Sequence, residues 1–444
     1  MCPHDNLKDI RMLIMLESTH PKFSWLLAKN PQTQATTGKP FERAMRKGRL
    51  FGWFTAEAGQ PLEHARRFTV WFKDSDTEAS FAPAGQGNFE YLDQTRHSSP
   101  YAVLFALNEM LRSAAQGQYE ESEANVENEH SVTIPSLYVP WSFAGKQFQR
   151  HFPDVNFELV PLVGKICRLR AWHRGTLKRL LSWLQLFCLL QLLGDFDMEL
   201  TLDSGVVTRY AKLLAEMNAP YFMRYLFSRK ALLAPERFKE AQPLLETETI
   251  KLCFGDTKTQ RFHAVSRELP GGVQLLDIGC GEGWQALRLA RKYEAVAAFD
   301  TNEELIERNQ RVARRKHLEH LTFEWGLNPE KVADLPLKPG CDVLMTEVVE
   351  HMPQEDAARL IRAVLSKPVR TVVVTTPDHA FNVHYDVERR HDDHHWEMCQ
   401  TEFSEWIQAL VGDRSDLSVQ VRGIGDSVDG VHTSLMAVIR REAA

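Results

Sequence analysis

Two acidic side chains and a histidine follow a short apolar run in the segment Asp342–Met352. If a helical turn begins at Glu347, then Glu350 and His351 follow it by three and four residues and share one face with it. Two carboxylates and one imidazole suit a divalent cation such as Mn²⁺ or Mg²⁺. A closed site needs at least one more ligand, and the His- and Asp-rich run 390–396 offers candidates. In isolation, the same pattern also fits a solvated helix face that carries scattered charge.

A glycine-rich turn lies upstream, between the apolar run 273–278 and the helical segment 284–292. Glycines at such a turn let the backbone approach a ligand closely and leave helix N-terminal N–H groups free. The spacing G-x-G-x-G, with an acidic residue two positions before the first glycine, resembles the first motif of the class I S-adenosylmethionine-dependent methyltransferases. An acidic residue at the end of the next strand is the expected acceptor for both hydroxyls of the adenosyl ribose. The predicted cofactor-binding residues are Asp277, Gly279, Gly281, Gly283 and Asp300.

From Pro270 onwards, apolar segments with strand character alternate with helical segments. This alternation predicts a parallel sheet with helices on both faces, whose ligands bind beyond the carboxyl ends of the strands. Asp277 and Glu347 then lie on the same rim. The predicted fold class is α/β, with a C-terminal class I (Rossmann-like) methyltransferase domain that contains a mostly parallel sheet, preceded by a mixed α+β N-terminal region. The expected strands are 273–278, 295–299, 321–324, 343–345 and 370–375.

The chain has 444 residues, of which 43% are hydrophobic and 25% are charged, as expected of a globular protein with a sizeable core. Its net charge of −6 argues against a long electrostatic footprint for nucleic acid, but not against an enzyme that grips one end of a strand. A basic run between Lys165 and Arg179 is a candidate for RNA contact. We expect an N-terminal mixed α+β domain (1–116), an acidic linker or loop (117–131), a second, helix-rich part of the N-terminal region (132–248) and the methyltransferase domain (249–444).

The cysteines and the apolar segments indicate a compartment. Seven cysteines are scattered singly without a C-x-x-C pair, so we expect neither a zinc ribbon nor a disulfide framework. The N-terminus has no basic stretch followed by an apolar core, so no signal peptide is predicted. The most apolar run, 180–193, is interrupted by polar residues and is shorter than the about 20 residues that cross a bilayer, so we expect a buried helix. The chain is therefore expected in the cytoplasm, without membrane contact.

A metal ion beside a methyl donor indicates a hydroxyl group as the methyl acceptor. A hydroxyl holds its proton too tightly to attack a sulfonium at neutral pH, whereas direct coordination lowers its pKa and fixes the oxygen in line with the methyl group. If Glu347, Glu350, His351 and a histidine from 391–395 bind the cation, two of its positions stay open. The adjacent hydroxyls of a ribose can fill both.

Together these segments resemble the metal-dependent small-RNA 3′-terminal ribose 2′-O-methyltransferases, whose bacterial members carry a long N-terminal region before the methyltransferase domain. The layout is similar over essentially the whole chain. Where the family usually has Asn, Phe and Trp, this chain has Asp378, Trp396 and Met398. The motifs that carry the resemblance are DIGCGEG at 277–283, EVVEHM at 347–352, Thr376-Pro377 with Asn382 downstream, and RHDDHHWE at 390–397.

The resemblance implies both a site and a substrate. Glu347, Glu350, His351 and His394 would bind Mn²⁺ or Mg²⁺, and the cation would bind the 2′ and 3′ hydroxyls of the terminal nucleotide of an RNA. The 2′ oxygen would attack the methyl group of S-adenosylmethionine. The resemblance also implies RNA repair at the RNA 3′ end with a polynucleotide kinase-phosphatase and ligase partner, which the N-terminal region would serve.

Two other functions fit parts of the sequence. A metal-dependent O-methyltransferase of a small vicinal diol, such as a catechol, satisfies the same metal chemistry, but it rarely needs some 245 extra residues. A non-catalytic scaffold of a repair complex predicts a damaged metal or cofactor site, whereas all four implied ligands are present. Within the metal site, His391 or His395 would replace His394 as the ligand if the loop register shifts.

Overall fold

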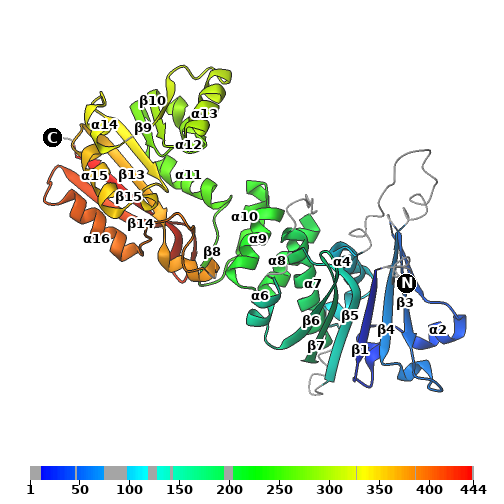
Figure 1. Ribbon diagram of the computed structural model, residues 1–444. Helices are drawn as coiled ribbons and strands as arrows, with labels where there is room; N and C mark the ends of the chain where they lie inside the picture. Colours follow the sequence, from blue (N-terminus) through cyan, green and yellow to red (C-terminus); the bar gives the residue numbers. More distant parts are fainter. Residues whose placement is uncertain are drawn as a thin grey trace, which may run out of the picture. The chain divides into compact units, whose positions relative to one another are not determined.

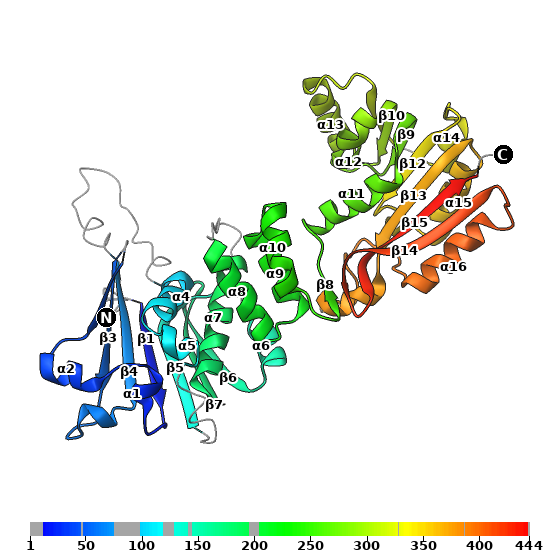
Figure 2. The ribbon, with the colours of Figure 1, turned by 180° about the vertical axis from the view of Figure 1, so that it is seen from behind.

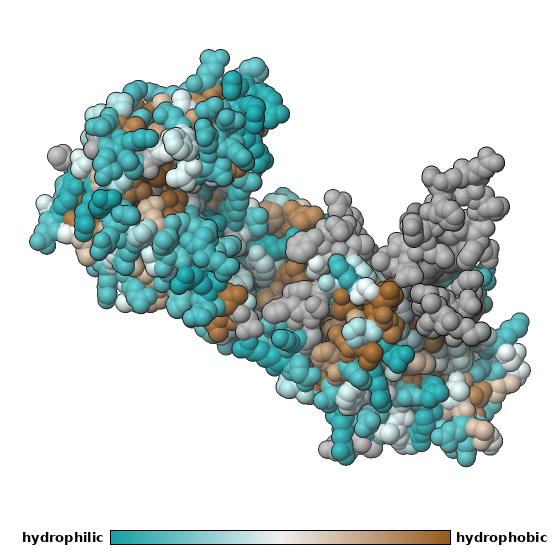
Figure 3. Space-filling view, in the orientation of Figure 1, coloured by the Kyte–Doolittle hydropathy of each residue, from teal (hydrophilic) through white to brown (hydrophobic). Residues whose placement is uncertain are grey.

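The structure is a computed structural model, and the chain forms two compact units, Met1–Leu232 and Leu233–Ala444. Figure 1 and Figure 2 show the elements of both units from opposite sides. Hydrophilic residues cover most of the visible surface, with smaller hydrophobic areas between them (Figure 3). The described residues are 12–45, 48–74, 98–118, 128–140, 144–194, 204–326, 328–385 and 387–442.

The N-terminal unit is built on one antiparallel sheet. Its seven strands are β1 (Leu13–Ser18), β2 (Phe41–Met45), β3 (Gly48–Thr55), β4 (Arg67–Asp74), β5 (Asn128–Tyr138), β6 (Val155–Val163) and β7 (Ile166–Gly175). They lie side by side in the order β2-β3-β4-β1-β5-β7-β6. Buried and less buried residues alternate along β1, as expected of a strand with one face on the core.

The helices of this unit include one long apolar helix, α7. They are α1 (Phe23–Leu26), α2 (Pro31–Thr37), α4 (Pro100–Glu109), α5 (Arg112–Ala115), α6 (Ala144–His151), α7 (Leu177–Gly194), α8 (Ser204–Glu216) and α9 (Tyr221–Ala231), with the 3₁₀ turn η1 (Leu62–His64). Among the described helices, α7 is long and apolar enough to cross a membrane, but 83% of that stretch is buried inside the protein. The expected buried helix at 180–193 is therefore confirmed.

The expected segment 117–131 does not separate two sheets. Strand β1 pairs with β4 on one side and with β5 on the other, so strands from both expected N-terminal parts form one sheet. Strand β5 begins at Asn128, inside the expected linker, and 119–127 lie outside the described residues. Pairing between distant strands leaves no local signal, so a polar segment alone does not mark a domain boundary. The compact units meet after Leu232 rather than after residue 248.

The C-terminal unit contains the mostly parallel sheet. Its strands are β8 (Ile250–Lys251), β9 (Gly272–Ile278), β10 (Tyr293–Asp300), β11 (Leu321–Trp325), β12 (Cys341–Thr346), β13 (Val369–Pro377), β14 (Leu417–Val428) and β15 (Val431–Arg441). Their order is β11-β10-β9-β12-β13-β15-β14-β8; neighbours from β11 to β13 pair in parallel, and the remaining pairs are antiparallel. All five expected strands and the α/β fold class are confirmed.

The C-terminal unit also contains helices, most of which cover the two faces of this sheet. They are α10 (Pro235–Leu245), α11 (Thr257–Glu268), α12 (Trp284–Leu289), α13 (Glu303–Arg315), α14 (Pro329–Asp334), α15 (Gln354–Leu365) and α16 (Gln400–Val411), with the 3₁₀ turns η5 (Ala290–Lys292), η6 (Val349–His351) and η7 (His379–Tyr385). Buried residues of α11, α12 and α13 join one hydrophobic core, and those of α14, α15 and α16 join the other.

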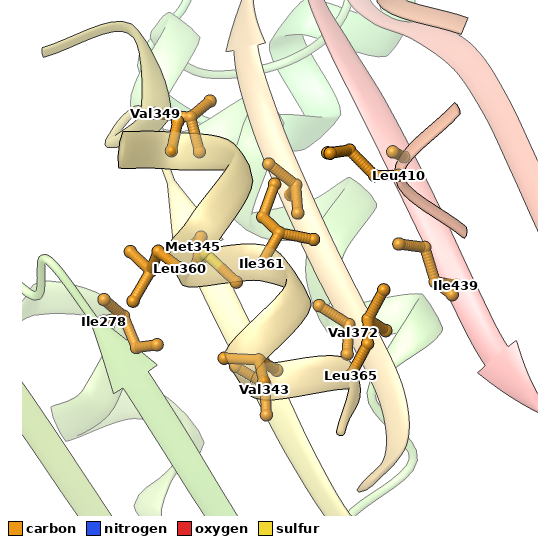
Figure 4. Close-up of a cluster of buried hydrophobic side chains, with 14 of the residues drawn as sticks. Ile278, Val343, Met345, Val349, Leu360, Ile361, Leu365, Val372, Leu410 and Ile439 are labelled. Carbon is orange, nitrogen blue, oxygen red and sulfur yellow. The ribbon is translucent and has the colours of Figure 1, made fainter. Parts of the chain in front are cut away.

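Helix α15 packs on strand β12, which precedes the candidate metal-binding segment 347–352. Its apolar residues recur every three or four positions, and Leu360 and Ile361 pack over Val343 and Met345 of β12 (Figure 4). Leu344, between the last two, belongs to the core on the opposite face. Each such fully buried side chain stabilises the fold by roughly 1.5–3 kcal/mol. The residues that follow β12 therefore start from a strand buried on both faces.

Candidate functional site

The segment after β12 departs from the expected helical turn. Glu347 has a left-handed φ of +54°, and its N–H donates to the carbonyl oxygen of Thr375 on β13 at 3.0 Å. The turn η6 begins only at Val349, so Glu347 does not share a helical face with Glu350 and His351. The expectation was wrong because Glu347 still bonds to the neighbouring strand. A non-glycine residue at positive φ is uncommon, and such strain concentrates at functional sites.

Glu350, His351 and His394 form a group that can hold a metal ion, since their ligand atoms all lie within 4.8 Å of one another. The Glu350 side chain is buried, and neither of its carboxylate oxygens has a hydrogen-bond partner among the described residues. Burial, and next the negative charge of Glu347, raise the pKa of Glu350 well above its usual value. A buried carboxylate without a partner is costly, and a bound cation would remove that cost.

A second buried carboxylate orients His394. Nδ1 of His394 lies 2.5 Å from Oε1 of Glu397, and both side chains are almost entirely buried. Glu397 also accepts hydrogen bonds from Nδ2 of Asn382 at 2.5 Å and from the N–H of Arg390 at 2.8 Å. Burial opposes these bonds, but together they hold the pKa of Glu397 below its usual value. The arrangement leaves Nε2 of His394 for a ligand, as in metal-binding histidines.

His351 is oriented by an exposed carboxylate. Its Nδ1 lies 3.1 Å from Oδ2 of Asp393. Burial lowers the pKa of His351 although Asp393 opposes the shift, and the neutral imidazole is the form that binds metals. The rings of His351 and His394 are 4.7 Å apart. His391 and His395 are exposed and lie outside the group of possible ligands, so the geometry favours His394 among the three candidates.

Glu347 lies beside this group but outside it. Its Oε1 accepts a hydrogen bond from the hydroxyl of Thr375 at 3.0 Å, and its Oε2 lies 3.1 Å from Nη1 of Arg261. The side chains of Arg261 and Glu347 are 18% and 17% exposed, and an ion pair so far from solvent is stronger than one on the surface. Sequence reasoning missed Arg261, because it lies on α11 in a segment without a motif. Only the folded chain brings it to Glu347.

The donor set fits a divalent cation. Glu350 supplies a buried oxygen that has no other partner among the described residues. The Nδ1 atoms of His351 and His394 each lie against a carboxylate, which leaves the Nε2 atoms for a metal ion. Mixed oxygen and nitrogen donors suit Mn²⁺ and Mg²⁺, and the two nitrogens favour Mn²⁺.

The glycine-rich turn joins β9 to α12 and touches the metal-binding segment. At Gly279 (φ +70°), a Cβ atom would lie 2.4 Å from Cγ2 of Val348, and at Gly283 (φ +69°) it would lie 2.9 Å from the ring of Phe323. Both positions therefore require glycine for conformation and for space. At Gly281 (φ +50°), a Cβ would meet nothing within 4 Å. The turn is thus packed on two sides and open at its centre.

Two acidic side chains flank this turn. Asp277 is 2% exposed, and its Oδ2 has no hydrogen-bond partner within the described part of the chain. Burial, and then the charge of Asp300, raise the pKa of Asp277 to about 7. Asp300 accepts the N–H groups of Gly281 at 2.7 Å and Asn302 at 2.9 Å, and each oxygen keeps a lone pair for a ligand. Asn309, which sequence reasoning missed, donates to the carbonyl oxygen of Gly281 at 2.8 Å. Asp277 and Asp300 stay the predicted cofactor ligands.

Solved structures of similar chains share this architecture. The chain matches one in the Pnkp1/Rnl/Hen1 RNA repair complex with a TM-score of 0.80 and 25% identity, over 97% of this chain and 100% of the other. A chain in another Pnkp1/Rnl/Hen1 complex gives a TM-score of 0.77 at 24% identity, over 97% of this chain and 100% of the other, and supports the fold alone.

A curated relative matches one segment of the chain. It is a small RNA 2′-O-methyltransferase of Caenorhabditis elegans, 36% identical over 72 residues. That match spans 15% of this chain and 16% of the relative's length.

Family models cover both units. A model described as a methyltransferase domain matches residues 275–367, which include the glycine-rich turn and the segment after β12. A model described as the Hen1 N-terminal domain matches residues 13–250, which is 238 of 444 residues and more than half of the chain. The chain therefore belongs to the family defined by the Hen1 N-terminal domain, here followed by a methyltransferase domain.

Proposed function

We propose that the chain transfers the methyl group of S-adenosylmethionine to the 2′-hydroxyl of the 3′-terminal ribose of RNA. The observation that carries the proposal is the contact between the two candidate sites. A Cβ atom at Gly279 of the glycine-rich turn would lie 2.4 Å from Val348, which precedes Glu350 and His351 in the metal-binding segment. The relative named as a small RNA 2′-O-methyltransferase supports this choice of acceptor.

The residues that would hold the cation are Glu350, His351 and His394, with Glu347 beside them. When bound, the cation supplies Lewis-acid chemistry, which lowers the pKa of a coordinated hydroxyl. Glu397 and Asp393 would keep the imidazoles oriented through Nδ1. These carboxylates reduce the freedom of both rings, so that the ligand atoms need little reorganisation on binding.

Other residues of the chain would bind the methyl donor. The glycine-rich turn leaves its centre open at Gly281, where a bulky ligand can approach the backbone. Asp300 would accept the ribose hydroxyls with the lone pairs that its bonds to the turn leave free. Asp277, buried next to the turn, would hold a proton or accept a donor of the cofactor at its unpartnered Oδ2.

We further propose that the chain acts in RNA repair together with a polynucleotide kinase-phosphatase and ligase. The support is the similar chain found in an RNA repair complex, which matches 97% of this chain. A cytoplasmic location belongs to the same proposal. The six described cysteines form no disulfide with one another, as is usual in a reducing compartment.

The test uses purified chain, labelled S-adenosylmethionine and short single-stranded RNAs that end in a free 2′,3′-diol, a 3′-phosphate or a 2′-deoxy sugar. We expect label on the diol RNA alone, loss of transfer in EDTA and recovery with Mn²⁺. The variant His394→Ala should lose transfer, whereas the matched variant His395→Ala at the exposed neighbouring position should keep it. Label on catechol but on no RNA would replace this proposal with the small-diol reaction, and cofactor binding without any transfer would indicate a scaffold.

A further inference from the structure

A cavity of about 210 Å³ lies within the N-terminal unit, between α4, α5, α7 and α8. Helix α7 forms one wall, and its residues are buried and apolar over most of its length. Three polar residues interrupt this composition and line the cavity, namely Lys178, Ser182 and Gln185. Their spacing of four and three residues places them on one face of the helix. The polar face of this core helix therefore faces the cavity.

Two of these residues are polar groups placed deep in the protein. Ser182 is 5% exposed and Gln185 is 7% exposed, yet both line the cavity. A buried hydroxyl and a buried amide cost free energy unless they have a polar partner. Apolar residues at these positions would complete the core of α7, whereas Ser182 and Gln185 offer a hydroxyl and an amide to a polar occupant of the cavity.

The rim of the cavity is strongly basic. Arg112, Lys178, Arg209 and Lys212 line it, with Glu216 as the acidic residue. Nζ of Lys178 lies 3.6 Å from Glu216, and Nη2 of Arg112 lies 3.4 Å from Glu109. Arg209 and Lys212 are therefore the cations of the lining that no carboxylate of the described residues balances. Arg209 and Lys212 are exposed, one turn apart on α8. This charge selects an anion.

Size narrows the choice of anion. Pockets for drug-sized ligands measure about 300–1,000 Å³, so a cavity of about 210 Å³ is too small for a whole nucleotide. It equals the share of about seven water molecules at ~30 Å³ each, which suffices for a phosphate group and its remaining waters. Arginine and lysine donors with neutral hydroxyl and amide groups are the usual partners of phosphate.

We propose that this cavity binds a phosphate group, supplied either by an RNA strand or by free phosphate. Arg209 and Lys212 provide the charge, and the buried side chains of Ser182 and Gln185 provide neutral hydrogen bonds. The site uses residues of the N-terminal unit alone and is independent of the proposed methyl transfer.

The test measures binding by the full chain with isothermal titration calorimetry at low salt. The probes are inorganic phosphate and one RNA prepared with a 5′-phosphate or a 5′-hydroxyl. The double variant Arg209→Ala/Lys212→Ala should weaken phosphate binding by at least about tenfold. The matched double variant Lys39→Ala/Lys146→Ala removes the same charge from exposed positions away from the cavity, and its affinity should stay within about twofold of that of the unaltered chain.

A neutral variant separates the cavity from long-range charge. Gln185→Leu keeps the net charge and fills the same space, so it should still weaken phosphate binding by about threefold to tenfold. Preference for the 5′-phosphate RNA over its 5′-hydroxyl form would assign the ligand to a terminal phosphate of RNA, and equal binding of the two RNAs would assign it to the internucleotide phosphates. Binding of inorganic phosphate but of neither RNA would assign the ligand to free phosphate. No binding of phosphate by the unaltered chain, equal losses in both double variants, or an unchanged affinity in Gln185→Leu would overturn the proposal. Methyl transfer in all variants should equal that of the unaltered chain.

Discussion

Replacing Glu397 with Gln tests whether the chain orients its proposed metal ligand through a buried carboxylate. In the structure, Glu397 accepts hydrogen bonds from Nδ1 of His394, from Asn382 and from the N–H of Arg390. Glutamine keeps the shape but presents one oxygen and removes the charge. A hydrogen bond to a charged group contributes about 1.5–3 kcal/mol, and each 1.4 kcal/mol of binding free energy changes a dissociation constant about tenfold. We therefore expect Mn²⁺ affinity to fall by roughly 10- to 100-fold, the usual effect of losing such a supporting carboxylate.

The assay titrates Mn²⁺ into the purified variant and follows free Mn²⁺ by electron paramagnetic resonance, so that it does not depend on methyl transfer. The matched control is Glu388→Gln, which changes an exposed glutamate that lines a pocket of the C-terminal unit together with Glu397. Thermal unfolding of both variants monitors the fold. An Mn²⁺ affinity of Glu397→Gln equal to that of the control, with the fold intact, would refute the reasoning that Glu397 positions His394.

Three further predictions concern the same unit. Arg261→Met removes the cation that lowers the pKa of the buried Glu350, so the pH–rate profile of methyl transfer should shift to higher pH; an unshifted profile would contradict this. The variant Gly279→Ala would place a Cβ atom 2.4 Å from a neighbouring side chain, so its affinity for S-adenosylmethionine should fall at least about tenfold. The control Gly340→Ala also changes a glycine at positive φ (+85°), but there the Cβ atom would meet open space, so the affinity should stay unchanged. Folding raises the pKa of Asp277 to about 7, so the folded chain binds this proton more tightly than the unfolded chain does. The free energy of unfolding should therefore fall as the pH rises from about 4 to about 7. Chemical denaturation at several pH values should show a smaller fall in the variant Asp277→Asn.

Local patterns predicted the C-terminal unit well, because its signals are local. The apolar strands, the glycine-rich turn and the acidic residues at strand ends each occupy a short stretch of sequence. The rule that ligands bind beyond the carboxyl ends of parallel strands then brings them to one rim. Strand β9 pairs with β12, so Asp277 near the end of β9 and Glu347 after the end of β12 belong to neighbouring strands, as predicted.

The features that were missed depend on contacts between distant segments. Glu347 takes a positive φ because its N–H bonds to Thr375 on β13, and helical spacing contains no information about that bond. Its partner Arg261 lies 86 residues earlier, on α11. In the N-terminal unit, the pairing of β1 with β5 crosses the polar segment 117–131. Sequence composition marks that segment as polar but does not indicate which strands it joins.

The glycine-rich turn and the metal-binding segment meet at one side chain, which relates the two halves of the proposed reaction. Val348 fills the space that Gly279 leaves, and it lies between Glu347 and Glu350 in the sequence. A shift of the turn on cofactor binding would therefore press on the residue that connects both carboxylates. Glu347 is at the same time held by Arg261 and Thr375, and the η6 turn that carries Glu350 and His351 follows Val348 directly. A shift of Val348 is therefore expected to reach Glu350 and His351 through η6 rather than through Glu347.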